Sequence, residues 1–168
     1  MDAMIREVVK YLPEEKPRLY QGSCDPLRIL ELIELGVDMF ESSYVYHGSQ
    51  DGFALSFPNK LEDEVIPENE DTNGANEKLL GYRLDIKDPM FKEDFSPLVK
   101  TCSCYACRKH TRAYVNHLLF TKELLGYVLL MIHNLHHYKV FFQTIRDCID
   151  KEGSLESIKS KLLLVREK

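Results

Sequence analysis

The chain lacks any apolar run close to the ~20 residues that a helix needs to span a bilayer. Its longest apolar run, from Tyr127 to Ile132, is short and ends at a histidine. The first residues lack the pattern of a secretory signal peptide, and the cysteines number five, which is odd. We therefore expect no integral membrane segment, no disulfide framework and a reducing compartment.

The charge of the chain is divided unevenly along its length. At 168 residues the sequence fits one domain or part of one. Residues 1–99 carry 10 basic and 21 acidic side chains, whereas residues 100–168 carry 12 and 6. A basic region is typical of proteins that contact nucleic acid, but it is equally typical of a solvated helical surface. Charge alone leaves both interpretations open.

Three cysteines and one histidine form the most specific pattern in the sequence. Cys102, Cys104 and Cys107 are spaced C-x-C-x-x-C, and His133 follows 26 positions later. Three thiolates and one imidazole are a standard ligand set for a closed, tetrahedral zinc site. A site with four protein ligands leaves no position for a reacting water, so this spacing predicts a structural zinc ion that joins a loop to a distant element.

Two alternatives to this metal site remain open at the level of spacing. The cysteines could be ordinary thiols. His133 also has competitors, because His136 and His137 lie close to it in the same predicted helix.

The first forty residues alternate between helix and strand patterns. Asp25 and Pro26 suit the N-cap and first turn of a helix, and Gly36 suits the position after its end. Alternation of this kind predicts an α/β fold, in which functional residues follow the strands, here at 21–24 and 41–44. The expected elements are helices at 2–12 and 25–36 and strands at 18–22 and 37–40.

The pattern changes after residue 52, where helices come to dominate. An acidic stretch at 62–76 reads as a loop, Thr121 suits the N-cap of a long helix, and Ser154 suits the N-cap of the last one. The expected elements are extended segments at 53–57 and 79–86 and helices at 111–120, 121–151 and 154–165.

Several of these motifs together resemble the zinc-binding end of tRNA-guanine transglycosylases. The resemblance covers nearly the whole chain apart from the acidic loop. It is carried by C-S-C-Y-A-C at 102–107, T-R-A-Y at 111–114, H-L at 117–118 and I-H-N-L at 132–135, and upstream by K-P-R-L-Y at 16–20 and L-G-V-D-M-F at 35–40.

The resemblance implies the C-terminal part of a TIM (β/α)₈ barrel with an inserted zinc-binding subdomain and C-terminal helices. Such a barrel normally needs ~250 residues, so we expect a C-terminal portion or a short isoform of a longer protein. The last barrel elements would occupy 1–58, the acidic loop 59–77, and the zinc-binding subdomain with the final helices 78–168. His133 matches the family's fourth zinc ligand.

The chain departs from the family pattern at the position of the catalytic nucleophile. Where the family has an aspartate after G-V-D-M-F, this chain has Glu41, and the Pro-Thr-Arg stretch that follows in the family is missing. Gln21 replaces a methionine that contacts the base in the family. A glutamate can act as a nucleophile, so an active transglycosylase using Glu41 stays an alternative, as does a zinc-stabilised RNA-binding module.

These departures resemble the non-catalytic homologue that pairs with a catalytic subunit in the eukaryotic queuine enzymes of the family. Such pairs exchange guanine for queuine at the wobble position of certain tRNAs. The resemblance implies a heterodimer, with a homodimer as the alternative, and tRNA as a partner. It also implies a cytoplasmic location with peripheral association at the mitochondrial outer membrane.

Surface residues of the zinc-binding part are candidates for tRNA contact. Lys109 and Arg112 could contact phosphates, which would add affinity without base specificity, although a solvated face explains either one equally well. We expect Tyr105, Tyr114 and Phe120 to pack against other side chains rather than stack on bases.

Overall fold

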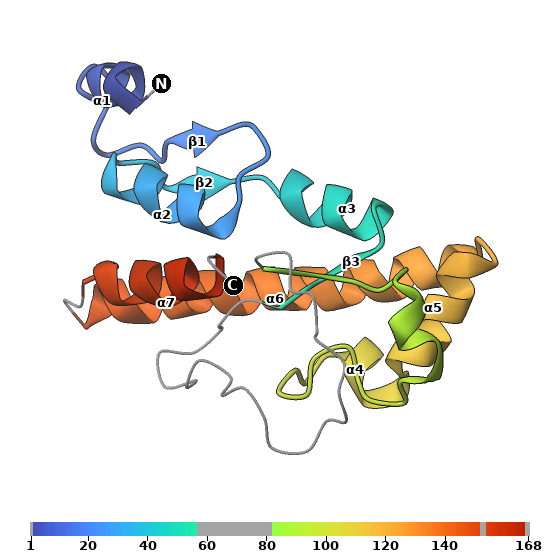
Figure 1. Cartoon of the computed structure of the whole chain (residues 1–168). Coiled ribbons are helices and arrows are strands. Elements are labelled where there is room, and N and C mark those ends of the chain that lie inside the picture. The colour runs from blue at the N-terminus through green and yellow to red at the C-terminus, as the bar shows by residue number, and fades with distance from the viewer. Residues whose placement is uncertain (1, 57–81, 152–153, 167–168) are drawn as a thin grey trace. The chain divides into compact units, whose positions relative to one another are not determined.

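The computed structural model describes residues 2–56, 82–151 and 154–166 (Figure 1). The contacts divide the chain into two compact units, residues 1–44 and 45–168. The expected domain boundaries at 58 and 77 lie outside the described residues, as does the acidic loop at 62–76.

The first unit contains a helix–strand–helix–strand sequence, as the residue pattern predicts. The two strands pair in parallel, with Leu19 opposite Met39 and Tyr20 opposite Phe40. A parallel pair joined by a helix is the repeating unit of α/β folds. The elements are α1 (Asp2–Val9), β1 (Leu19–Tyr20), α2 (Pro26–Glu34) and β2 (Met39–Phe40).

The ends of α2 follow the capping signals in the sequence. Asp25 is the N-cap, and its carboxylate accepts a hydrogen bond of 2.8 Å from the backbone N–H of Arg28. Pro26 occupies the first turn, where its missing N–H costs nothing. Gly36, with φ of +94°, turns the chain out of the helix in the left-handed region that a glycine adopts without strain.

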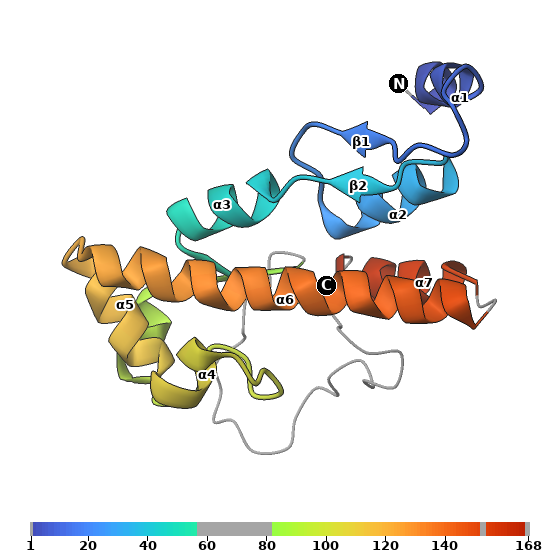
Figure 2. The ribbon, with the colours of Figure 1, turned by 180° about the vertical axis from the view of Figure 1, so that it is seen from behind.

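The second unit is built around one long helix. Figures 1 and 2 both show α5 folded back beside the first part of α6 and α7 beside its last part. β3 and α4 also contact α6. The elements are α3 (Ser43–Gln50), which crosses the boundary between the units, β3 (Phe53–Leu55), β4 (Arg83–Asp85), a 3₁₀ helix η1 (Pro89–Glu93), α4 (Tyr105–Lys109), α5 (Arg112–Phe120), α6 (Leu124–Asp150) and α7 (Glu156–Arg166).

The core of this unit lies where α4, α5 and α6 meet the hairpin of β3 and β4. Apolar side chains from all of these elements are buried together there, and burial of this kind stabilises by about 25 cal/mol per Å². The principal members are Ala54, Leu84, Ile86, Phe91, Leu98, Ala106, Val115, Leu118, Leu119, Leu129 and Leu130.

The structure corrects three expectations about helices. The sequence pattern did not predict α3 or α4. Thr121 does not begin the long helix, because its hydroxyl donates to the carbonyl of His117 at 3.0 Å and closes α5 instead. The chain turns at Lys122, whose φ is +59°, and α6 begins at Leu124.

The mixed helix and strand composition of the predicted α/β class is confirmed. The described residues form two two-stranded sheets, so the barrel itself stays a prediction. β3, which we assigned to the barrel part, pairs with β4 and contacts α6 in the second unit. None of the helices in the described ranges combines the length and the apolar composition that crossing a membrane requires.

Arg112 is an interior residue, which corrects its expected role as a tRNA contact. Its guanidinium pairs with Asp94 at 3.1 Å and donates two hydrogen bonds to the carbonyl of Leu98. It also lies 5.3 Å from the centre of the Phe91 ring. With only 7% of the residue exposed, the group holds the loop before α4 against α5 and is not available to a phosphate.

Replacing Asp94 with asparagine should destabilise the protein, because the buried guanidinium of Arg112 loses its anion. Removing one partner of a fully buried pair costs about 3–5 kcal/mol, and we expect about 2 kcal/mol here because Asp94 is partly exposed. Chemical denaturation followed by circular dichroism measures the change. As a control, Asp2→Asn removes the exposed partner of Arg28 and should leave the unfolding free energy nearly unchanged.

The same ion pair predicts how this loss depends on pH. Burial raises the pKa of Asp94, but hydrogen bonds from Ser96 and the contact with Arg112 outweigh burial and hold the pKa below its usual value. A carboxyl with a lowered folded-state pKa stabilises the fold above the unfolded value of about 3.9, and this contribution is lost as the pH falls through the folded value. The difference in unfolding free energy between D94N and the unmodified protein should therefore be largest at pH 7 and shrink on acidification below about pH 4. A difference that is constant with pH would contradict this account.

Candidate metal centre

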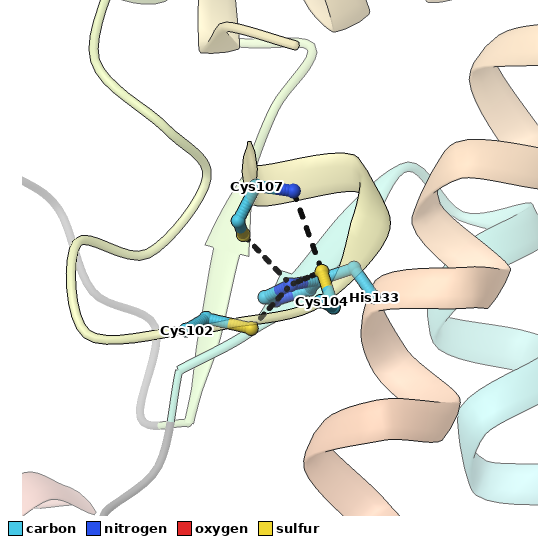
Figure 3. A group of neighbouring side chains, drawn as sticks. All are labelled: Cys102, Cys104, Cys107 and His133. Atoms are coloured by element: carbon cyan, nitrogen blue, oxygen red, sulfur yellow. Dashed lines mark hydrogen bonds between the residues drawn. The ribbon is translucent and has the colours of Figure 1, made fainter. Parts of the chain in front are cut away.

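The four predicted ligands come together from two separate parts of the second unit. Cys102 and Cys104 lie just before α4, Cys107 lies within it, and His133 lies in the middle of α6 (Figure 3). Cys104 is the N-cap of α4, since the backbone N–H of Cys107 donates to its sulfur at 3.3 Å. The C-x-x-C spacing therefore both starts this short helix and turns two sulfurs toward the same point.

The distances between the ligand atoms fit a tetrahedral metal ion. The Nδ1 atom of His133 lies 3.6 Å from the sulfur of Cys102, 3.6 Å from that of Cys104 and 3.3 Å from that of Cys107. All four ligand atoms lie within 4.8 Å of one another. A tetrahedral zinc ion with bonds of about 2.3 Å to sulfur and 2.0–2.1 Å to nitrogen would separate S and N by about 3.5 Å.

The burial of the cluster indicates a closed site. His133 has no exposed surface, Cys104 and Cys107 are buried, and Cys102 is half-buried. Four protein ligands complete a tetrahedral shell, which leaves no position for a substrate or a reacting water. The residues present thus fit a structural metal ion, and three sulfurs with one imidazole are a set typical of zinc.

A contact made by Nε2 of His133 holds the ring so that Nδ1 faces the sulfurs. Nε2 lies 2.9 Å from the backbone carbonyl of Leu55 in β3. A carbonyl only accepts, so Nε2 carries a proton, and Nδ1 is the nitrogen that can give its lone pair to a metal ion. The sequence did not single out Leu55, because the carbonyl that orients a histidine belongs to the backbone and carries no residue signature.

Hydrogen bonds within the cluster shift the acidity of its members. Hydrogen bonds from the side chains of Cys102 and Cys107 lower the pKa of Cys104. Hydrogen bonds with Cys102 and Cys104 raise the pKa of Cys107. Burial would lower the pKa of His133, but hydrogen bonds to the sulfurs of Cys102 and Cys104 outweigh it and raise the pKa to about 9. A metal ion therefore has to displace protons from this cluster, and its binding weakens as the pH falls.

The structure also resolves the choice among the neighbouring histidines. In the described ranges, the cluster that could hold a metal contains His133 and neither His136 nor His137. His137 packs its ring 4.6 Å from the ring of His133. His136 directly precedes His137 on α6, and its Nε2 lies 3.5 Å from the hydroxyl of Ser103.

The other residues singled out from the sequence do not join this centre. Glu41 follows β2 in the first unit, is exposed, and accepts a hydrogen bond of 2.7 Å from the hydroxyl of Ser43. Lys109 is exposed at the end of α4.

Three aromatic residues that we expected to pack against other side chains are exposed. Tyr105, Tyr114 and Phe120 are 51%, 40% and 85% exposed. His110 lies beside both tyrosines, with its ring 5.8 Å from Tyr105 and stacked 5.1 Å from Tyr114. Tyr105 and Tyr114 thus pack against His110 at the surface of α4 and α5, whereas Phe120 is largely exposed.

Comparison with known proteins places this chain in a family. A family model described as queuine tRNA-ribosyltransferase matches residues 1–168. The chain belongs to this family. The resemblance to tRNA-guanine transglycosylases, which the cysteine, R-A-Y and H-N motifs indicated, is therefore confirmed.

Curated relatives of the chain carry the name queuine tRNA-ribosyltransferase accessory subunit 2. The protein of that name from Drosophila pseudoobscura pseudoobscura is 47% identical over 150 residues, which cover 89% of this chain and 33% of that protein. The human protein is 41% identical over 176 residues, which cover 92% of this chain and 42% of that protein. The chain thus spans about a third to two fifths of the length of these relatives.

We expect the purified chain to bind one equivalent of zinc and to lose it when Cys104 or Cys107 is replaced by serine. Binding energy in small zinc modules is on the order of 10 kcal/mol and contributes directly to folding, so both variants should also unfold at lower temperature. Native mass spectrometry and thermal denaturation measure the two effects. Cys148→Ser is the control, because Cys148 is buried near the end of α6 outside the cluster. Full metal content in the C104S and C107S variants would contradict the site.

Proposed function

We propose that this chain is the metal-carrying portion of a non-catalytic subunit of queuine tRNA-ribosyltransferase. In this proposal it holds one structural zinc ion, pairs with a catalytic subunit, and supports the exchange of guanine for queuine at the tRNA wobble position. The observation that carries the proposal is the complete Cys₃His cluster in a chain that has Glu41 at the nucleophile position. The names of the curated relatives support the accessory role.

The surroundings of Glu41 argue against a role as nucleophile. Its side chain is one methylene longer than the aspartate of the family, and a displacement of about 1 Å can cost ~10²-fold in rate. The hydroxyl of Ser43 also donates to one oxygen of this carboxylate, and a hydrogen bond of that kind lowers the nucleophilicity of the oxygen that accepts it.

The proposed zinc ion would act on structure and not on chemistry. Cys102, Cys104, Cys107 and His133 would hold it, and the closed ligand set gives it no open position. Its contribution is to join the segment around α4 to the middle of α6, so that the helices of the second unit keep one arrangement.

An apolar surface on α6 is where we place the catalytic subunit. The side chains of Leu124, Leu125, Val128, Ile132 and Leu135 are between 37% and 75% exposed. We call these five residues the α6 stripe; spacings of three and four residues put them on one face of the helix. A protein that acts as an accessory subunit needs a partner surface, and exposed apolar groups gathered on one face are typical of such surfaces.

The remaining parts of the proposal follow from the family resemblance and the surface charge. Lys109 is exposed at the end of α4 and is the candidate for contact with a tRNA phosphate. We place the protein in the cytoplasm, with peripheral association at the mitochondrial outer membrane.

Guanine-exchange assays test the accessory role. The purified protein alone should incorporate no labelled guanine or queuine into substrate tRNA, and it should support incorporation when the catalytic subunit is added. Glu41→Gln should leave the activity of the pair within about twofold, because in this proposal the carboxylate does not attack the ribose. Robust exchange by the protein alone, together with its loss in E41Q, would overturn the proposal in favour of an active transglycosylase.

Charged residues placed in the α6 stripe should weaken pairing with the catalytic subunit. We expect the double substitution Val128→Asp and Leu135→Asp to raise the Kd of the heterodimer at least tenfold, since burying two carboxylates in an apolar contact is unfavourable. Both side chains are exposed, so the fold should persist. Phe95→Asp is the matched control, because Phe95 is 78% exposed and lies outside the stripe. Sedimentation of the mixed subunits measures the Kd, and an unchanged value would refute this placement.

A further inference from the structure

The strand β3 has hydrogen-bonding groups on two edges, and among the described residues β4 pairs with one of them. Toward β4, the carbonyl of Gly52 accepts from the N–H of Ile86 at 3.1 Å, and the N–H of Ser56 donates to the carbonyl of Tyr82 at 2.9 Å. Alternation along a strand turns the next backbone groups to the opposite edge. Three of these groups bond to α6: the carbonyl of Phe53 and the N–H and carbonyl of Leu55.

Asn134 of α6 satisfies two of these three groups. Its side-chain oxygen accepts from the N–H of Leu55 at 2.8 Å, and its side-chain nitrogen donates to the carbonyl of Phe53 at 2.9 Å. One carboxamide thus pairs with the strand as the peptide group of a neighbouring strand would. The second N–H of the same nitrogen donates to the hydroxyl of Ser49 at 2.9 Å, and Asn134 has no exposed surface.

The third of these groups contacts the metal centre. The carbonyl of Leu55 lies 2.9 Å from Nε2 of His133, the residue directly before Asn134 on α6. Two adjacent side chains of one helix therefore hold the two ends of the Leu55 backbone, and one of them is the predicted metal ligand. The position of the Leu55 carbonyl decides how the His133 ring is oriented toward the sulfurs of Cys102, Cys104 and Cys107.

We propose that Asn134 is a positioning residue of the metal centre, which fixes β3 so that the Leu55 carbonyl holds His133 with Nδ1 facing the three sulfurs. This inference rests on the proposed metal ion and not on the accessory role of the protein. Without the carboxamide, the buried N–H of Leu55 and carbonyl of Phe53 lose their partners, which is unfavourable enough to shift the strand. A shifted carbonyl releases Nε2, and the ring can then turn so that Nδ1 no longer faces the three sulfurs.

Two variants of Asn134 and one control separate this role from simple packing. Asn134→Ala removes both contacts to β3, whereas Asn134→Asp keeps the volume and places a carboxylate against the carbonyl of Phe53. Ser49→Ala is the matched control, because it removes one buried hydrogen bond of Asn134 and leaves both contacts to the strand intact. Competition with a chromophoric chelator gives the affinity for zinc, and cobalt substitution reports the ligand geometry.

We expect N134A and N134D to bind zinc roughly ten- to a hundredfold more weakly, as is typical when the partner of a metal-bound histidine is disturbed. S49A should bind within about threefold of the unmodified chain. If N134A does not fold, N134D carries the comparison. Unchanged zinc affinity in the folded Asn134 variants, or an equal loss in S49A, would overturn the inference. Failure of the unmodified chain to bind zinc would instead overturn the proposed metal ion and this inference with it.

Hydrogen exchange gives a second, independent test of the positioning role of Asn134. Because Asn134 and His133 hold the N–H and the carbonyl of the same residue, zinc should slow exchange of the Leu55 amide in the unmodified chain. In N134D this protection by zinc should be lost, while the amides of α5 keep theirs. Equal protection of the Leu55 amide in both proteins would contradict the positioning role and leave the metal site itself untouched.

Discussion

The imidazole of His133 makes the contacts on which the second unit depends. One ring nitrogen faces three sulfurs and the other meets the carbonyl of Leu55, so a single buried side chain joins the α4 segment, α6 and β3. Each of these elements is short or irregular apart from α6, and a five-residue helix has little stability of its own. The arrangement therefore depends on long-range contacts made by α6, which alone is long enough to carry them.

The features that the sequence predicted well are those whose signals are local. The cap at Asp25, the glycine turn at Gly36 and the cap at Ser154 involve partners within three residues along the chain. The cysteine spacing is local in the same sense, because C-x-x-C determines both the start of α4 and the convergence of two sulfurs. His133 was predicted through the family motif. The distances from its Nδ1 to the three sulfurs then favour it over His136 and His137.

The features that the sequence did not predict depend on partners far along the chain. Arg112 looked like a surface cation, and its burial depends on Asp94 and Leu98, 18 and 14 residues earlier. Asn134 looked like an ordinary helix residue, although it pairs with a strand about eighty residues earlier. Thr121 carries a hydroxyl that suits either end of a helix, and the turn at Lys122 decided which end it closes.

The proposed combination of a metal site with an altered nucleophile position has a physical explanation in the two faces of α6. His133 and Leu124 are nine residues apart, which is about two and a half turns, so the metal ligand points away from Leu124 and from most of the α6 stripe. An ion that fixes one side determines the direction in which the other side presents its apolar groups. On this argument the proposed zinc serves recognition of the partner. Such a role needs the full ligand set and needs nothing from the carboxylate at position 41.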